Sequence, residues 1–143
     1  ISALITVVNG ESFLREAIDS TLNQTFQDFK LIIVDDGSTD NTALIIDSYQ
    51  NPIIRKITFP CNMGRVFALN VGVSVARGNF IALMDADDVN APDRFARQIS
   101  ILEKNSDIMV CGSNLKFIDN YGVYLGEQNL PLTPNEIKWQ SIF

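Results

Sequence analysis

The sequence contains no histidine and only two cysteines among its 143 residues. Without histidine, the chain cannot hold a Ser/His/Asp triad, a Cys–His nucleophile or a His-ligated zinc ion. Cys61 and Cys111 are 50 residues apart and belong to no CxxC pair, so zinc held by paired cysteines is disfavoured as well. We expect both cysteines to be buried free thiols in a reducing cytosol.

Positive charge is also scarce, with 11 Lys and Arg against 17 Asp and Glu and a net charge of −6. A nucleic-acid-binding protein would carry a basic stripe, so we expect no nucleic-acid partner. No apolar run reaches the roughly 18–20 residues that span a bilayer, and no signal-peptide pattern opens the chain. We therefore expect a cytoplasmic protein without a transmembrane segment in this chain, associated with the inner face of the membrane only peripherally, if at all.

What is present indicates one compact domain over residues 1–143. Hydrophobic residues make up 46% of the chain, which is enough to bury a core of ordinary size. The chain begins at Ile1 inside an apolar run and stops at Phe143 inside a predicted helix. We therefore expect a fragment of a longer chain, truncated at the C-terminus.

Strands and helices alternate along the sequence. Apolar runs predict strands over residues 4–8, 31–34, 53–59 and 80–84, with shorter strands at 108–111 and 115–118 before a turn at 120–122. Amphipathic stretches predict helices over 11–23, 40–49 and 64–76, one that begins near Pro92, and a last one opened by a capping box at 133–136. This alternation predicts an α/β fold whose mostly parallel central sheet is flanked by helices.

Two predicted helices have an assigned buried face. For the helix over 64–76, the expected buried residues are Val66, Leu69, Val73 and Ala76. For the helix that begins near Pro92, they are Phe95, Ile99 and Leu102.

Small and acidic residues follow three of the predicted strands. These are Asn9–Gly10, Asp35-Asp36-Gly37-Ser38 and Asp85-Ala86-Asp87-Asp88. Ligands of open α/β sheets bind beyond the carboxyl ends of the strands, where these aspartates would repel one another and raise their pKa values. A divalent cation with oxygen ligands relieves that repulsion, and the absence of His and paired Cys favours Mg²⁺ or Mn²⁺ over zinc. For Asp35 and Asp36, a solvated turn that caps the next helix is an equal alternative.

Several segments in order resemble the family 2 glycosyltransferases of the Rossmann-like GT-A fold, over essentially the whole length. The segments are NGESFLREAIDSTLNQTFQDFKLIIVDDGSTDNT (Asn9 to Thr42), NMGRVFALNVGVSVARGNFIALMDADD (Asn62 to Asp88) and PDRFARQ (Pro92 to Gln98). The resemblance implies transfer of a sugar from a nucleotide-sugar, preferably a UDP-sugar, to an acceptor hydroxyl, with inversion and with Mn²⁺ or Mg²⁺. The acceptor would be a saccharide, a lipid-linked glycan or a protein, as in bacterial cell-wall or polysaccharide biosynthesis.

The resemblance also assigns roles to residues. Asp36 would accept a hydrogen bond from uracil with Asp35 beside it, and the DxD motif falls on Asp85-Ala86-Asp87. Asp85 would lie near the ribose, Asp87 would reach the metal on the diphosphate, and Asp88 is a further candidate metal ligand. Further nucleotide-sugar contacts are expected from Thr6, Val8, Asn9 and Arg65. Arg65 would place positive charge near the phosphates, although a surface arginine without that role is an equal alternative.

The sequence departs from the family pattern in two places. The first strand usually ends Pro-x-Tyr-Asn but here reads Thr6-Val7-Val8-Asn9, so stacking of a tyrosine near the base is missing. No carboxylate after residue 88 lies in a matching general-base motif; those present are Asp93, Glu103, Asp107, Asp119, Glu127 and Glu136. We therefore place the general base beyond Phe143 and expect this fragment to bind donor and metal without it.

Two alternatives come from other classes of protein. A phosphoacceptor receiver domain also has an acid pair after a strand, and it would use Asp85 with Ser113 and Lys138. Its acid pair follows the first strand, however, whereas Asp35 and Asp36 follow the second. A nucleotide-sugar-binding module without catalysis is the other alternative.

Overall fold

The computed structural model describes residues 1–131. The predicted capping box at 133–136 and Lys138 lie outside the described residues. In the described part, no helix is long and apolar enough to cross a membrane.

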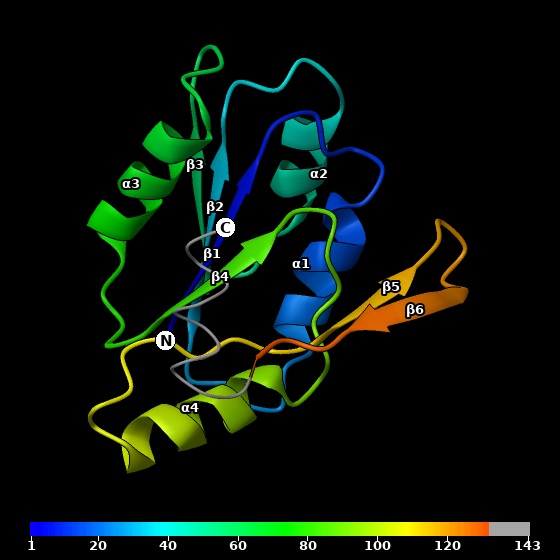
Figure 1. Cartoon of the computed structure of the whole chain (residues 1–143). Coiled ribbons are helices and arrows are strands. Elements are labelled where there is room, and N and C mark those ends of the chain that lie inside the picture. The colour runs from blue at the N-terminus through cyan, green and yellow to red at the C-terminus, as the bar shows by residue number, and fades with distance from the viewer. Residues whose placement is uncertain (132–143) are drawn as a thin grey trace.

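A four-stranded parallel sheet forms the centre of the molecule (Figure 1). Its strands are β1 (Ser2–Val7), β2 (Lys30–Asp35), β3 (Ile54–Thr58) and β4 (Ile81–Asp85), in the order β3-β2-β1-β4. Thr6 of β1 lies between Val34 of β2 and Asp85 of β4, so these strands end at one rim. The predicted parallel α/β architecture is confirmed, and the order matches part of the doubly wound Rossmann arrangement.

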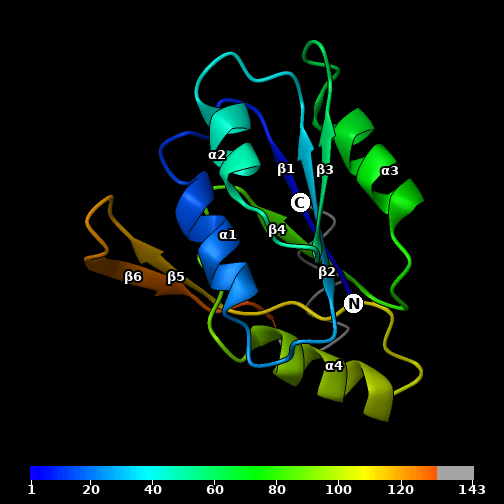
Figure 2. The same cartoon turned by 180° about the vertical axis from the view of Figure 1, so that it is seen from behind.

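Helices cover both faces of the sheet (Figures 1 and 2). The helices are α1 (Leu14–Leu22), α2 (Thr42–Ser48), α3 (Arg65–Val75) and α4 (Arg94–Lys104). Alternate residues of β1 face opposite sides: Ile5 packs in the core cluster with α1, whereas Leu4 packs with Ala68 of α3. Strands buried on both faces explain the unbroken apolar runs in the sequence. Phe95 of α4 closes the larger cluster from the amino-terminal end of the strands, with its ring edge-on to Phe29.

The predicted buried face of α3 is partly wrong. Val66 and Val73 are 73% and 44% exposed, whereas Ala68 and Gly72 are buried against Leu4. Apolar residues occur all round this helix, so periodicity could not select the face that the sheet covers. The other assigned face is confirmed, since Phe95 and Ile99 of α4 are buried and Leu102 is half-buried.

After α4 the chain forms an antiparallel hairpin of β5 (Leu115–Ile118) and β6 (Tyr124–Gln128). The strand predicted at 115–118 is confirmed, but residues 108–111 have no regular structure. The hairpin projects beside α1 (Figures 1 and 2). A strand after the turn at 120–122 was not predicted.

Both cysteines are free, but neither is buried. Cys61 is exposed and Cys111 is half-buried, which corrects the expectation of buried thiols. Each lies in a segment without regular structure, where the local sequence gives no burial pattern.

Candidate functional site

Asp36 lies just past the carboxyl end of β2 and is only 3% exposed. Its two carboxylate oxygens accept hydrogen bonds from the backbone N–H groups of Met63 (2.7 Å) and Gly64 (3.0 Å). Gly64 is the N-cap of α3, so the negative charge lies at the positive end of that helix. Asp36 is therefore neither a solvated turn residue nor a cap of α2: it joins β2 to the start of α3.

Asp35 has a different environment, although it is the neighbouring residue. It is 1% exposed, and its Oδ1 accepts the backbone N–H of Ser38 at 3.0 Å. Its Oδ2 is buried and has no hydrogen-bond partner among the described residues. Asp35 thus stabilises the turn after β2, as one of the two interpretations predicted, but it is buried and not solvated.

Gly37 makes the turn after β2 possible. Its φ is +70°, and a Cβ at this position would lie 2.2 Å from the carbonyl carbon of Cys61. Only glycine tolerates both the backbone conformation and the approach of the segment that leads into α3. The close approach of these two loops brings residues 61–65 beside Asp36.

Asp40 lies just before α2 and accepts a backbone N–H group at its start. Its carboxylate accepts the backbone N–H groups of Thr42 and Glu11, at 3.0 and 3.1 Å. Desolvation raises the pKa of the Asp40 carboxylate, but the hydrogen bonds from Thr42 and Glu11 together outweigh it, so the pKa lies below its usual value. Thr42 is the first residue of α2 and Asn41 is its N-cap, so Asp40 bonds the first N–H of the helix from the position before the cap.

A hollow of about 130 Å³ opens at the carboxyl end of β1. It is lined by Thr6, Val7, Val8, Asp36, Asn62, Arg65 and Ala68. The structure therefore brings four residues of the predicted site together from three separate segments: Thr6, Val8, Asp36 and Arg65. Asn62 was not singled out as a site residue, although it opens one of the segments that resemble the family.

Asn9 holds the end of β1 to the loop after β2. Its backbone N–H donates to Ser38 Oγ at 2.9 Å, and its side-chain oxygen accepts the N–H of Thr39 at 2.8 Å. Its φ of 53° is one that Asn tolerates better than most residues. In this structure Asn9 fixes two rim loops together and does not line the hollow.

Arg65 and Asp85 join the start of α3 to the end of β4. Arg65 Nη2 lies 2.5 Å from Asp85 Oδ1, and the two side chains are 69% and 56% exposed. An exposed ion pair contributes only about 0–1 kcal/mol to stability. Its importance is therefore positional: it places a cation and a carboxylate beside the hollow, both accessible to a ligand.

The acidic loop continues from β4 through Asp87 and Asp88, which are exposed. Partial burial, then the negative charges of Asp85 and Asp87, raise the pKa of Asp88 above its usual value, while Arg94 opposes the rise. The predicted mutual repulsion is thus present at Asp88. No group of three or more Asp, Glu or Cys side chains converges as a metal cage in the described residues. Mg²⁺ and related cations need no such cage, because they bind through one or two carboxylates together with substrate phosphates.

A buried polar network anchors the segment after the acidic loop to α1. Asn90 receives a hydrogen bond from Arg94 (2.5 Å), and its backbone N–H and side-chain amide donate to Ser20 and Thr21, both at 3.0 Å. Gln24 accepts the N–H of Phe95 at 3.0 Å and donates to the carbonyl of Ala91 at 2.7 Å. The sequence alone did not reveal these residues, because each reads as an ordinary polar residue of a helix or loop.

Two of the carboxylates after the acidic loop have structural partners. Asp93 pairs with Arg97 at 2.6 Å, and Asp119 accepts the N–H groups of Tyr121 and Val123 in the hairpin turn. Glu136 lies outside the described residues. Neither Asp93 nor Asp119 lines the hollow.

Comparison with known proteins gives a consistent result. The family model described as "Glycosyl transferase family 2" matches residues 2–143. An uncharacterised glycosyltransferase of Haemophilus influenzae is 36% identical over 124 residues, which cover 85% of this chain and 49% of that protein. The chain thus spans about half the length of this relative.

Solved structures agree in fold. The crystal structure of residues 1–349 of S. aureus TarS in complex with UDP has a TM-score of 0.67 at 26% identity, covering 72% of this chain and 32% of that one. The mannosyltransferase PcManGT of Pyrobaculum calidifontis, in complex with GDP-Man and Mn²⁺, has a TM-score of 0.66 at 22% identity. The match covers 71% of this chain and 31% of that one. Both are GT-A glycosyltransferases, as the predicted fold requires.

Proposed function

The chain belongs to glycosyl transferase family 2, and from that premise we propose that it is the donor-binding part of a metal-dependent, inverting glycosyltransferase that uses a UDP-sugar. The observation that carries the proposal is the hollow at the carboxyl end of β1, with Asp36 in its lining and the Arg65–Asp85 pair beside it. Ligands of open α/β sheets bind at this position.

Asp36 is proposed to recognise the base. Its oxygens already accept two backbone N–H groups, which fix the carboxylate in one orientation. Each carboxylate oxygen can accept more than one hydrogen bond, so the uracil N3–H can be a further donor. Thr6 and Val8 line the same hollow and would contact the ring through their backbone, in place of the tyrosine that this sequence lacks.

The acidic loop and Arg65 are proposed to hold the diphosphate. Asp87 and Asp88 would bind Mn²⁺ or Mg²⁺ together with phosphate oxygens, and Asp85 would lie near the ribose. A bound metal ion acts as a Lewis acid that stabilises the charge of the departing diphosphate. Arg65 supplies a second positive charge on the same rim. Its guanidinium is oriented by Asp85, whose Oδ1 accepts a hydrogen bond from Arg65 Nη2 at 2.5 Å.

TarS with UDP and PcManGT with GDP-Man and Mn²⁺ support a nucleotide-sugar donor and a divalent metal. The general base is proposed to lie beyond Phe143, and the acceptor to be a saccharide, a lipid-linked glycan or a protein hydroxyl. We place the enzyme in the cytoplasm of a bacterium, in cell-wall or polysaccharide biosynthesis. A receiver domain is disfavoured by the strand order, since a receiver places its third strand beside its first and here β3 lies at the far side of β2.

The decisive variant for the metal is Asp87→Asn, which keeps the shape of the side chain but removes a negative oxygen ligand. Titration calorimetry with UDP in the presence of Mn²⁺ should show binding at least about tenfold weaker than for the original chain. Without divalent cations, the two proteins should bind UDP equally weakly.

Asp107→Asn is the matched control, because it makes the same change of charge at another exposed aspartate. It should leave UDP affinity in Mn²⁺ unchanged. Equal affinities of the original chain and Asp87→Asn in Mn²⁺ would contradict the proposed metal site.

A further inference from the structure

A second and larger hollow lies at the opposite end of the strands. It has a volume of about 600 Å³ and is lined by the beginnings of β1, β2 and β3 and by the turn between α3 and β4. Ser2 lines this hollow and Thr6 lines the first one, so the two are separated by the length of β1. Nothing in the proposed donor site uses it.

Three cations line the larger hollow: Lys30, Arg55 and Arg77. Arg55 pairs in register with Ile32, and Lys30 precedes Ile32 by two residues, so both project from the face of the sheet that α3 covers. Arg77 follows the end of α3, and its backbone N–H donates to Ser2 Oγ at 3.1 Å. Strand register and this hydrogen bond therefore bring the three cations to one place.

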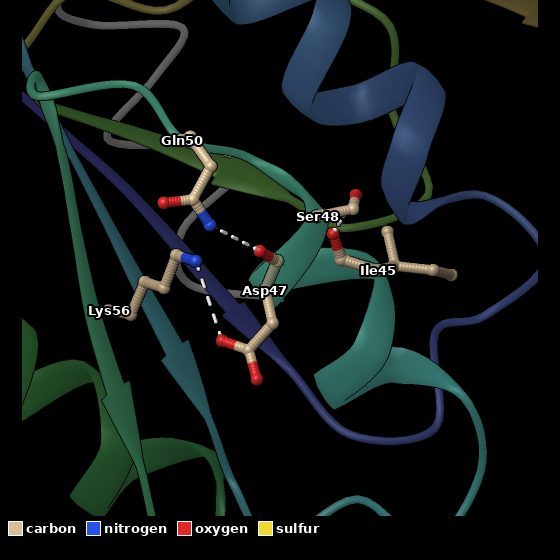
Figure 3. Close-up of polar contacts among 5 residues, drawn as sticks. All are labelled: Ile45, Asp47, Ser48, Gln50 and Lys56. Carbon is tan, nitrogen blue, oxygen red and sulfur yellow. Dashed lines mark hydrogen bonds and ion pairs between the residues drawn. The ribbon is translucent and has the colours of Figure 1, made fainter.

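Ion pairs engage three of the cations in residues 1–131. Arg65, Arg97 and Lys56 each form an ion pair, the last with Asp47 at 3.4 Å (Figure 3). Among residues 1–131, no carboxylate lies within ion-pair distance of Lys30, Arg55 or Arg77. The one acidic residue in the lining is Asp28, so the lining carries a net positive charge in a chain whose net charge is −6.

We propose that this hollow binds a phosphate-bearing anion. Arg offers a planar fork of donors that matches two oxygens of a phosphate, and Lys adds a mobile charge. The volume lies within the range of ordinary ligand sites, so the hollow accommodates more than a single inorganic ion. The same chemistry occurs in a free diphosphate and in the headgroup of an anionic lipid, and the experiment below separates these two sources.

The test measures the binding of two probes in the presence of EDTA, so that no divalent cation contributes. Inorganic pyrophosphate is titrated by calorimetry, and vesicles of equal parts phosphatidylglycerol and phosphatidylcholine are tested by flotation against pure phosphatidylcholine. We expect binding that weakens as salt is added, because it is electrostatic. Lys30→Gln and Arg55→Gln should each weaken it about fivefold.

Lys56→Gln is the matched control. Lys56 is the neighbour of Arg55 in β3, but it points to the other face of the sheet and pairs with Asp47 (Figure 3). Its replacement removes the same charge from the same strand and should leave binding of both probes unchanged. All three side chains lie on the surface or at its edge, so we expect the variants to fold.

Binding of pyrophosphate alone would assign the site to a soluble anion, and binding of the mixed vesicles would assign it to a lipid headgroup. The proposal is overturned if neither probe binds, or if Lys56→Gln weakens binding as much as Arg55→Gln does. Because metal is absent and the variants lie at the far end of the strands, failure here would leave the donor-site proposal untouched.

Discussion

At the scale of single residues, the chemistry of the rim depends on how differently three aspartates are held. Asp36 is buried and bonded to two backbone N–H groups, Asp85 is paired with Arg65, and Asp88 faces other carboxylates and has a raised pKa. Asp36 is thereby suited to directional recognition of a neutral base. Asp88, beside Asp87, gains most from a cation that neutralises the repulsion.

Replacement of Asp36 separates recognition of the base from a structural role. Asp36→Ala removes the acceptor for uracil N3–H, which should weaken UDP binding by about 1.5–3 kcal/mol. Cytosine carries no proton on N3, so CDP loses no such hydrogen bond. Calorimetry in Mn²⁺ should therefore show that the ratio of UDP to CDP affinity falls about tenfold or more.

The ratio is the informative quantity, because Asp36→Ala also leaves the N–H groups of Met63 and Gly64 without their acceptor. Movement of that loop would weaken the binding of both nucleotides equally. Asp36→Asn is the second variant: it keeps one side-chain oxygen, and its amide can donate to cytosine N3, so preference should shift toward CDP. If UDP and CDP lose affinity by the same factor, the role of Asp36 is purely structural, and the proposal of a uridine nucleotide as donor is contradicted.

Four of the residues predicted from strand ends and family segments come together in the structure. Thr6, Val8, Asp36 and Arg65 were named in advance and meet in one hollow. Asn62 was not, since its position beside Asp36 results from the close approach of residues 61–62 to Gly37. That approach is a tertiary contact between loops, and no local pattern in one sequence encodes it.

At the scale of elements, α1 and α2 are joined by Tyr49. Its hydroxyl lies 2.7 Å from Asp19 Oδ1, and Arg15 lies over its ring at 5.7 Å. Partial burial, then the hydrogen bond and negative charge of Asp19, raise the pKa of Tyr49 from 10.0 to about 12. The contact is thus made by the neutral phenol.

A raised pKa in the folded state predicts a loss of stability in alkali. The contribution of Tyr49 should be fully present below pH 10, the unfolded value, and should be lost as the pH rises to about 12. Tyr49→Phe should be less stable by about 1 kcal/mol at pH 8 and should lack this additional loss. Urea unfolding of both proteins between pH 8 and 12 checks this, and a difference that stays constant over the range would contradict it.

Gln24 connects α1 to the start of α4 and thereby supports the segment after the acidic loop. It is 2% exposed and satisfies the Ala91 carbonyl and the Phe95 N–H. Gln24→Ala leaves both groups unpaired, so the free energy of unfolding should fall by about 2 kcal/mol or more in urea titrations.

The control for Gln24 is Gln50→Ala. The Gln50 amide donates to the Asp47 carbonyl at 2.9 Å, but on the exposed surface (Figure 3). Its loss should change stability by no more than about 0.5 kcal/mol. Equal effects of the two variants would show that the Gln24 network does not support the loop.

Elements were predicted well where the pattern had one interpretation. Strands β1, β2 and β4 were found because each is mostly an apolar run that ends at turn residues, as with β2 before Gly37. The buried face of α3 was not predicted correctly, because valines occur on all sides of this helix. Strand β6 was missed because it contains Gly126 and two polar residues at its end, and pairing with β5 alone defines it.

At the scale of the whole molecule, opposite ends of the sheet carry opposite charge, and part of one face is uncovered. Ile81 and Leu83 of β4 are 42% and 52% exposed, because α3 packs over β1 and β2. Their register places both on the same side of the sheet as Leu4. The sequence predicted a strand over residues 80–84, without this exposure.

The donor hollow and the acidic loop both lie within residues 1–131, so the chain should bind donor nucleotide although it spans about half the length of its relative. A ligand at 100 times its dissociation constant adds about 2.7 kcal/mol to the stability of the folded state. For a chain of this size that raises the melting temperature by about 8 °C.

Thermal-shift titrations of UDP, GDP and TDP, each with and without Mn²⁺, measure this directly. UDP with Mn²⁺ should give the largest shift, because the hollow of about 130 Å³ suits a single ring better than the two rings of guanine. TDP should give less than UDP, because its deoxyribose lacks the 2′-hydroxyl that Asp85 is proposed to approach. Equal shifts for all three nucleotides, or shifts that do not depend on Mn²⁺, would show that the chain recognises neither uridine nor a metal-bound diphosphate.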